Sequence, residues 1–255
     1  MDKLTSNFII KQYQSGVESY ASFTTEVGLW ESEKYVFEKY LKKTDQILDI
    51  GCGTGRTTFD LYGLGFKDIV GIDLTPEMIQ KANELNKYFQ LEIPFHVGDA
   101  TDLNYEDERF DSVIFSFNGM MSIPSQQQRS KALSEINRVL KVDGIFIFTT
   151  HDREQEEAYL EFWKQQKVVW DQAKQNPKLY EFGDIITTSK NEQREIYIHI
   201  PNQAEIQSFL KNGNFEVLET FYRSDQFEEK EKVKEKSGEC RFWVVKKINH
   251  QHATK

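Results

Sequence analysis

The sequence contains little cysteine, and basic residues are fewer than acidic ones. Cys52 and Cys240 are its two thiols among 255 residues. They lie far apart in apolar contexts, which excludes a disulfide framework and predicts a reducing compartment. No cysteine or histidine spacing is that of a metal site, so we predict no bound metal. The 32 Lys and Arg against 41 Asp and Glu give a net charge of -9, which argues against nucleic-acid partners because these need a basic surface.

Long apolar runs are also absent. No segment approaches the roughly 20 apolar residues of a membrane span, and Phe8-Ile9-Ile10 is too short for the core of a signal peptide. We therefore expect a cytoplasmic protein with no membrane partner, and both a monomer and a dimer fit the composition. The length suits one large domain with an appended subdomain. Aromatic residues make up 13% of the chain, and several fall outside the expected sheet, which indicates a pocket or a cap.

Residues 46–56, Gln-Ile-Leu-Asp-Ile-Gly-Cys-Gly-Thr-Gly-Arg, couple a short apolar strand to a glycine-dense turn. Residues 56–64 then have the apolar spacing of a helix. Glycines there can adopt positive φ, and the unpaired N–H groups of a helix N-terminus favour an anionic group. A dinucleotide fingerprint has the spacing G-x-G-x-x-G. Here the spacing is G-x-G-x-G, with Arg56 in place of the last glycine, so a dinucleotide oxidoreductase is the least favoured function.

Two acidic residues follow the next two expected strands. Residues 68–74, Asp-Ile-Val-Gly-Ile-Asp-Leu, form an apolar run that ends at Asp73, where a carboxylate can accept hydrogen bonds from a ribose diol. Thr75 and Pro76 are typical of a helix cap and first turn. Residues 94–100 read as a third strand that ends at Asp99. The sequence thus predicts a nucleoside-binding edge on a parallel sheet.

This series of motifs resembles motif I and the following motifs of class I S-adenosylmethionine-dependent methyltransferases, strongly over residues 46–150 and weakly over 200–247. The resemblance implies an α/β fold with a Rossmann-like, doubly wound, seven-stranded mixed sheet, and S-adenosyl-L-methionine as the cofactor. It implies that Asp73 binds the ribose, that Met78 lies against the adenine, and that Asp99 and the backbone N–H after it read the adenine ring. The cofactor-binding residues expected on this basis are Asp49, Gly51, Cys52, Gly53, Gly55, Asp73, Leu74, Met78, Asp99, Ala100, Phe115 and Ser116.

Three of these positions have a structural alternative. Asp49 either contacts the cofactor or bonds the glycine turn or a neighbouring loop. For Cys52 the favoured role is small-residue packing in the turn, and Met78 is also compatible with a place in the core. For Tyr13, Tyr20 and Trp30, upstream of the turn, the alternatives are closing over the site or docking the helices, with docking favoured for Trp30.

Four segments are expected. Residues 1–45 form an N-terminal helical cap, 46–150 the cofactor-binding core, 151–200 a lid insertion, and 201–255 the C-terminal part of the core sheet. Within the lid we predict a helix over 154–175, then strands at 184–188 and 193–200 around a turn at 189–192. The remaining predicted elements are strands at 110–117, 145–150, 215–222 and 239–247, helices at 126–140 and 202–211, and a solvated charged loop at 225–236.

The predicted reaction is methyl transfer to a small or medium polar metabolite, by an in-line displacement that depends on alignment. A base is needed only when the acceptor must lose a proton. His151, just past strand five, is the first candidate and His199 on the lid is the second, while a structural or surface role is the alternative for each. Arg153 and Arg241 either bind an anionic group or pair within the fold. The alternative functions are a tRNA or protein methyltransferase and a non-catalytic S-adenosylmethionine-binding module. The acidic net charge counts against tRNA as the substrate.

Overall fold

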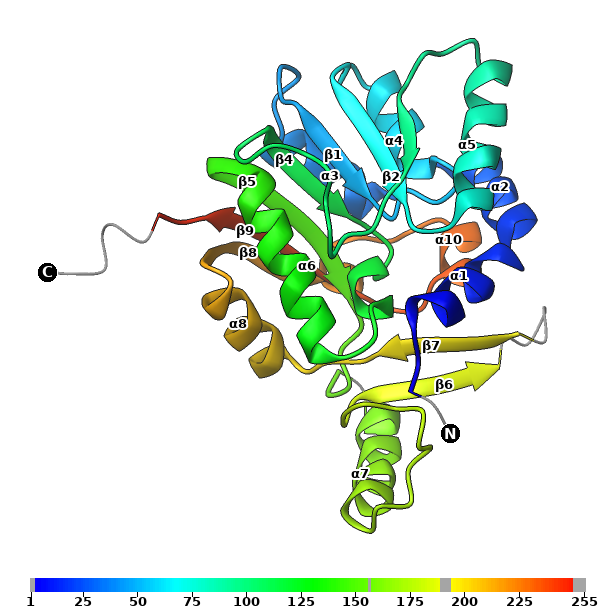
Figure 1. Cartoon of the computed structure of the whole chain (residues 1–255), viewed down its shortest axis with the longest axis vertical. Helices are drawn as coiled ribbons and strands as arrows, with labels where there is room; N and C mark the ends of the chain where they lie inside the picture. The colour runs from blue at the N-terminus through cyan, green and yellow to red at the C-terminus, as the bar shows by residue number, and fades with distance from the viewer. Residues whose placement is uncertain (1–2, 156, 189–193, 250–255) are drawn as a thin grey trace, which may run out of the picture.

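The centre of the protein is a mixed sheet, seen here in a computed structural model that describes residues 3–155, 157–188 and 194–249 (Figure 1). The described strands form a seven-stranded sheet of order β3-β2-β1-β4-β5-β9-β8. Strands β1 to β5 pair in parallel, whereas β9 runs antiparallel between β5 and β8. The predicted doubly wound, seven-stranded fold is confirmed. The strands are β1 (Ile47–Ile50), β2 (Ile69–Asp73), β3 (Phe95–Val97), β4 (Phe110–Phe115), β5 (Leu140–Thr150), β8 (Phe215–Tyr222) and β9 (Arg241–Lys247).

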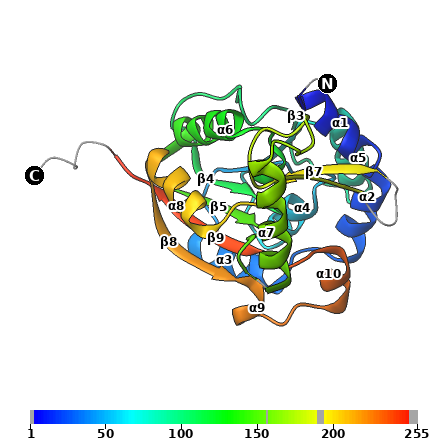
Figure 2. The same cartoon turned by 90° about the horizontal axis from the view of Figure 1, so that it is seen from below.

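Both faces of the sheet are covered by helices (Figure 2). Alternate residues of a strand point to opposite faces, so Ile47 of β1 joins one core cluster and Leu48 joins the other. Because both faces are buried, the central strands read as nearly continuous apolar runs. The first cluster contains residues of α3 (Glu31–Tyr40), α4 (Arg56–Gly63) and α5 (Pro76–Tyr88), and the second contains residues of α6 (Gln126–Val139) and α8 (Gln203–Asn212).

The N-terminal residues are helical, as predicted, and form α1 (Ser6–Gln14), α2 (Val17–Glu26) and α3. Helix α2 packs on α4 and α5, and α1 contacts α5 and β7. The first two helices therefore lie over the edge of the sheet at which the parallel strands end. No helix among the described residues is long and apolar enough to cross a membrane.

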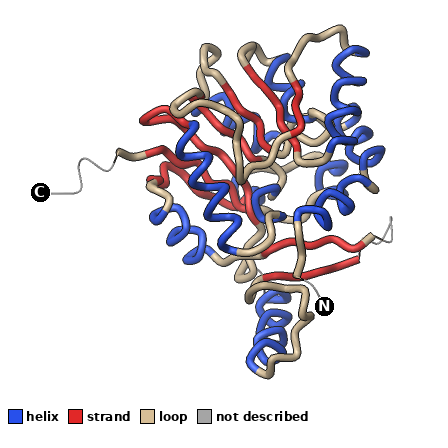
Figure 3. The backbone as a smooth tube through the Cα atoms, in the orientation of Figure 1, coloured by secondary structure: helices blue, strands red, loops and turns tan. Residues whose placement is uncertain are grey.

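The insertion after β5 contains α7 (Glu157–Asp171) and a separate two-stranded sheet of β6 (Asp184–Thr188) and β7 (Glu195–His199), which project away from the main sheet (Figure 3). The helix is shorter than predicted, and the predicted turn at 189–192 lies outside the described residues. Successive residues of β7 point to opposite faces of the hairpin. Its buried face carries Tyr197 and His199, whereas Ile196 and Ile198 are half-buried.

The charged segment 225–236 was predicted as a solvated loop; most of its residues are exposed as expected, but part of it is helical rather than a loop. It contains the end of α9 (Arg223–Gln226), all of α10 (Glu231–Lys236), and the buried residues Glu229 and Val233. The Glu229 carboxylate accepts hydrogen bonds from the N–H groups of Glu31 and Ser32, each at 3.0 Å, and from the Ser32 hydroxyl at 2.6 Å. A carboxylate at a helix N-terminus satisfies unpaired N–H groups and interacts favourably with the positive end of the helix dipole. Glu229 therefore holds this segment against α3.

Candidate active site

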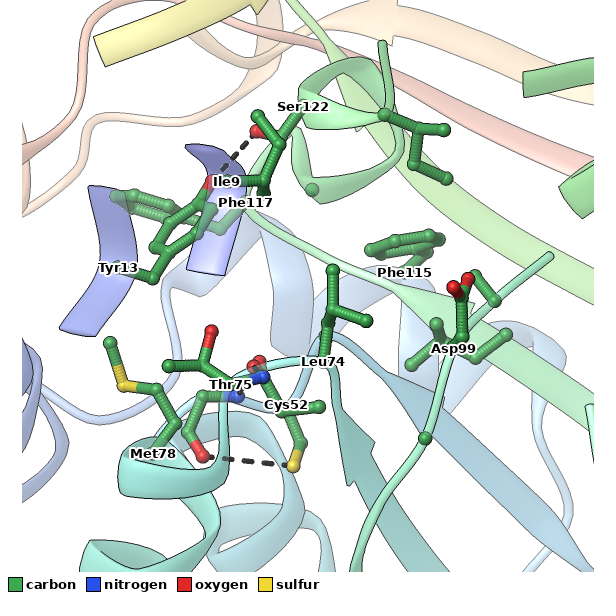
Figure 4. Close-up of a pocket in the computed structure, with 18 of the residues that line it drawn as sticks. Ile9, Tyr13, Cys52, Leu74, Thr75, Met78, Asp99, Phe115, Phe117 and Ser122 are labelled. Carbon is green, nitrogen blue, oxygen red and sulfur yellow. Dashed lines mark hydrogen bonds between the residues drawn. The ribbon is translucent and has the colours of Figure 1, made fainter. Parts of the chain in front are cut away.

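A cavity of about 390 Å³ lies where β1, β2, β3 and β4 end, beneath α1 and α2 (Figure 4). In an open α/β sheet, ligands bind at this carboxyl edge. Eleven of the twelve predicted cofactor-binding residues line the cavity: Asp49, Gly51, Cys52, Gly53, Asp73, Leu74, Met78, Asp99, Ala100, Phe115 and Ser116. Gly55 does not line it and instead caps the N-terminus of α4 with φ +95°.

The glycine turn leaves room for a ligand because it lacks side chains. Gly51 has φ +63° and Gly53 has φ +56°, which are conformations that L-residues with a side chain rarely adopt. A Cβ atom on Gly51 would lie 2.7 Å from Cε2 of Phe115, so that position is also closed by packing. Gly53 has open space where its Cβ would be, which makes its backbone accessible from the cavity.

Asp73 ties the glycine turn to the start of α5. Its Oδ2 accepts from the N–H of Gly53 at 3.0 Å, and its Oδ1 accepts from the N–H of Thr75 at 2.8 Å. Burial raises the pKa of this carboxyl above its ordinary value, and the two backbone donors act against that rise. A carboxylate offers about four lone-pair sites, so acceptor capacity remains for the hydroxyl groups of a ribose.

Asp49 lines the cavity from β1 and also bonds the helix that follows the turn. Its side chain is buried, and Oδ2 accepts from the Thr58 hydroxyl of α4 at 2.6 Å. Burial raises the pKa of Asp49 to about 7, and the bond from Thr58 acts in the opposite direction. Asp49 can therefore contact a ligand in the cavity, which was the first alternative. It also makes a hydrogen bond within the fold, which was the second, but its partner Thr58 lies in α4 rather than in the turn or a loop.

The far end of the cavity is lined by residues that follow β2 and β3. Asp99 Oδ1 accepts from both the N–H and the hydroxyl of Thr101, each at 2.8 Å, which fixes the orientation of the carboxylate. Met78 is buried at the start of α5 and also lines the cavity. It therefore fits both the predicted contact with a ligand and the alternative place in the core.

Comparison with known proteins decides the family. A family model described as a methyltransferase domain matches residues 41–214, which is more than half of the chain. The chain belongs to this methyltransferase family. Together with the cavity geometry, this makes S-adenosylmethionine the methyl donor of the enzyme.

Individual relatives cover different shares of the methyltransferase. An uncharacterised protein of Methanocaldococcus jannaschii is 31% identical over 192 residues, covering 74% of this chain and 68% of that protein. The human eEF1A lysine and N-terminal methyltransferase is 30% identical over 117 residues, covering 44% of this chain and only 17% of that protein. A crystal structure of an S-adenosylmethionine-dependent methyltransferase from Methanosarcina mazei matches with a TM-score of 0.68 at 20% identity, covering 87% and 99% of the two chains, and shows the shared fold.

An ion pair that the sequence did not predict joins the N-terminal helices of the methyltransferase to the glycine turn. Arg56 donates to both carboxylate oxygens of Glu33, each at 2.6 Å, and to the carbonyl of Gly28 at 2.9 Å. Its guanidinium also lies 5.3 Å from the ring centre of Phe23 and 5.1 Å from that of Trp30. The residue that replaces the third glycine of a dinucleotide motif therefore fastens α3 to α4.

Neither predicted catalytic histidine lines the cavity. His151 Nδ1 lies 2.7 Å from the carbonyl oxygen of Glu239, so Nδ1 donates, and Nε2 accepts from Asn118 Nδ2 at 3.2 Å. Burial lowers the pKa of His151, which favours the neutral ring that this pattern requires. His199 is buried, with Nδ1 2.8 Å from Asp184 and Nε2 2.5 Å from Glu205. Both histidines are therefore held by hydrogen bonds within the fold, which fits the structural role given above as the alternative to catalysis.

The predicted arginines also have partners within the fold. Arg153 donates to the carbonyl of Ile200 at 2.9 Å and to Glu205 at 2.7 Å, and Arg241 donates to the Thr220 hydroxyl at 3.2 Å. Among the described residues, neither lines the cavity.

A group of potential metal-ligand atoms occurs at the base of the lid. Atoms of Glu181, Asp184 and His199 lie within 4.8 Å of one another. These atoms are held by hydrogen bonds, because Glu181 accepts from Arg129 at 2.7 Å and Asp184 pairs with His199. The cluster is thus accounted for as an anchor between the lid and the core.

The remaining walls of the cavity come largely from the N-terminal helices and η1 (Gly119–Ser122). Tyr13 and Tyr20 line it, and the Tyr13 hydroxyl lies 2.7 Å from Oγ of Ser122 (Figure 4). Trp30 is buried in the core, which agrees with the docking role favoured for it. Ser122 and Tyr180 were missed, because no motif marks a single serine or tyrosine that reaches a site from a distant segment.

Proposed function

We propose that the methyltransferase acts on a small molecule that is enclosed in the cavity, rather than on a protein side chain or tRNA. The observation that carries this proposal is the cover over the cavity. The Leu4 N–H donates to the Lys178 carbonyl at 3.3 Å, and the Tyr180 hydroxyl donates to the Leu4 carbonyl at 2.6 Å. Leu4 and Tyr180 both line the cavity, so two distant segments close it together.

The residues of the cavity fit the cofactor. S-adenosylmethionine supplies an electrophilic methyl group on a positively charged sulfur, and the leaving thioether is neutral. Asp49, Asp73 and Asp99 are acidic side chains in the cavity wall and favour a positively charged ligand. We assign the ribose to Asp73 and the adenine to Asp99 and Met78, while the open backbone at Gly53 lets the methionine part approach the turn. The protein then acts mainly by alignment and by excluding water.

A protein acceptor is the second candidate, because the human relative is named as a lysine and N-terminal methyltransferase of eEF1A. That relative shares 17% of its length with this chain. A protein side chain would have to reach the methyl group past α1 and the segment at Tyr180, so this function requires the cover to open.

The proposal is tested with methyl-labelled S-adenosylmethionine and a cell extract divided into metabolite, RNA and protein fractions. We expect label in the metabolite fraction alone, with less label when Asp73→Ala replaces the wild-type protein at the same subsaturating S-adenosylmethionine concentration. Label in the protein or RNA fraction, absent with the variant, would overturn the small-molecule assignment.

A further inference from the structure

At the cavity end of β4, one aromatic ring lies between two glycines. Phe115 is the last residue of β4 and lines the cavity. A Cβ atom on Gly51 would lie 2.7 Å from Cε2 of this ring, and a Cβ atom on Gly119 would lie 2.5 Å from the same ring atom. Both distances are well below a carbon–carbon contact of about 3.5 Å. The edge of the ring therefore fits only because both neighbours lack a side chain.

The glycine at position 119 is required by the ring and not by the backbone. Gly51 has φ +63°, which itself favours glycine, whereas the φ of Gly119 is not positive. An alanine would therefore suit the backbone at position 119 and is excluded by the Phe115 ring. This ring is buried and belongs to the second core cluster, so it has little room to move aside.

A strained turn brings Gly119 back onto the ring. Phe117 has φ +55° and Asn118 has φ +59°, and these left-handed conformations are rare for residues with a side chain. Such a conformation persists only where the surrounding structure holds it. The Asn118 N–H donates to Thr149 Oγ1 at 2.8 Å, and Asn118 Nδ2 donates to His151 Nε2 at 3.2 Å. These two bonds fasten the turn to the end of β5.

Helix η1, which begins at Gly119, joins this turn to two other segments. The Ser122 hydroxyl lies 2.7 Å from the hydroxyl of Tyr13 in α1, and η1 also contacts β7 of the hairpin (Figure 4). Contacts thus run from the glycine turn through Phe115 and η1 to α1 and β7. No residue of β7 lines the cavity itself, so β7 is linked to a ligand there only through its neighbours.

We propose that Phe115 is a positioning residue that couples the methyl-donor site to η1 and, through η1, to α1 and β7. A donor bound at residues 51–53 fixes the Phe115 ring, and the ring fixes the start of η1. By linkage, the same contacts raise the affinity for the donor when η1 is in place. The proposal rests on the placement of the donor given under the proposed function, and it holds for a small-molecule and a protein acceptor alike.

Hydrogen exchange with and without saturating S-adenosylhomocysteine tests the coupling. In the wild type we expect the ligand to slow exchange both in residues 51–55 and in β7, by at least about threefold. In Phe115→Leu, with the protein again saturated, we expect residues 51–55 to be protected and β7 to exchange as it does without ligand. No protection of β7 in the wild type, or equal protection of β7 in both proteins, would overturn the proposal.

Gly119→Ala tests the same contact without a change in the glycine turn. The added methyl group pushes the ring towards Gly51 or into the cavity, and we expect the affinity for S-adenosylhomocysteine to fall about tenfold by calorimetry. In the Phe115→Leu background the same substitution should lower the affinity by less than about twofold, because the ring is gone. The matched control is the exposed Gly63→Ala, whose Cβ meets nothing within 4 Å and which should bind as the wild type does.

A merely structural glycine gives a different result. Gly119→Ala would then lower the free energy of unfolding and leave the affinity of the folded protein unchanged, which would contradict the coupling, as would an equal loss of affinity in both backgrounds. Failure of the proposed function is a separate result. Label in a protein fraction would overturn the small-molecule acceptor without changing the protection of β7, and a ligand that leaves residues 51–55 unprotected would overturn the placement of the donor.

Discussion

At the scale of single residues, Asp73 connects the glycine turn with the predicted ribose site. Replacing it with alanine removes the acceptor for the N–H groups of Gly53 and Thr75 and for a ribose diol. We expect Asp73→Ala to weaken S-adenosylhomocysteine binding by about 1–3 kcal/mol, as for unpaired polar groups. Calorimetry measures this, with the exposed Asp68→Ala as the matched control in the same segment. Equal affinity of wild type and Asp73→Ala would remove the ribose assignment.

The second residue-scale prediction concerns pH. The pKa of Asp49 is raised to about 7 by burial, so the carboxyl is ionised above that pH and becomes neutral below it. A positively charged ligand prefers the ionised form, and S-adenosylmethionine affinity should therefore fall as the pH drops from 8 to 6, by roughly two- to tenfold. Asp49→Asn should bind with an affinity that is flat over this range. A wild-type profile as flat as that of the variant would show that Asp49 does not face the cofactor charge.

At the scale of elements, one buried ion pair joins α3 to α4. Removing Arg56 alone leaves the buried Glu33 carboxylate without its partner. Breaking a buried pair in this way costs about 3–5 kcal/mol, whereas replacing both partners with apolar residues is often neutral. We expect Arg56→Met to lower the free energy of unfolding by that amount, and Arg56→Met with Glu33→Leu to recover most of it in denaturant titrations. A double variant as unstable as the single one would contradict this account.

The elements also show what the sequence can predict. The strands and the glycine turn were predicted because their signals are local, an apolar run next to glycines at fixed spacing. The bond from Ser32 to Glu229 spans 197 residues, and no local pattern encodes such a partner. The two histidines were predicted from their places near strand ends, but the direction of a side chain depends on neighbours such as Glu239 and Asp184. The grouping of the glycine turn and the strand-end aspartates around one cavity was thus predictable, whereas the walls contributed by other segments were not.

At the scale of the whole molecule, α1, whose residues Ile9 and Tyr13 line the cavity, is hydrogen-bonded to β7 of the hairpin. The Gln12 side chain accepts from the N–H of Tyr197 at 2.9 Å and donates to its carbonyl at 3.4 Å. We expect Gln12→Leu to increase hydrogen exchange in residues 3–14 and 194–200, because the buried backbone of β7 loses its partner. Exchange in β1 and β4 should not change. The exposed Lys11→Leu on the same helix is the control, and equal exchange in both variants would show that Gln12 does not hold α1 against β7.

The cover over the cavity has a consequence for the order of events during synthesis. Leu4 and α1 are synthesised before their partners at Lys178, Tyr180 and Tyr197, which are made about 180 residues later, on the order of ten seconds or more at usual rates. Until then the nascent chain can form the strands that carry the glycine turn, and α1 can pack on α5, but the contact between α1 and β7 is missing. We therefore expect the cavity to be covered only after β7 has emerged, so that the methyl donor is held firmly only from that point of synthesis onward.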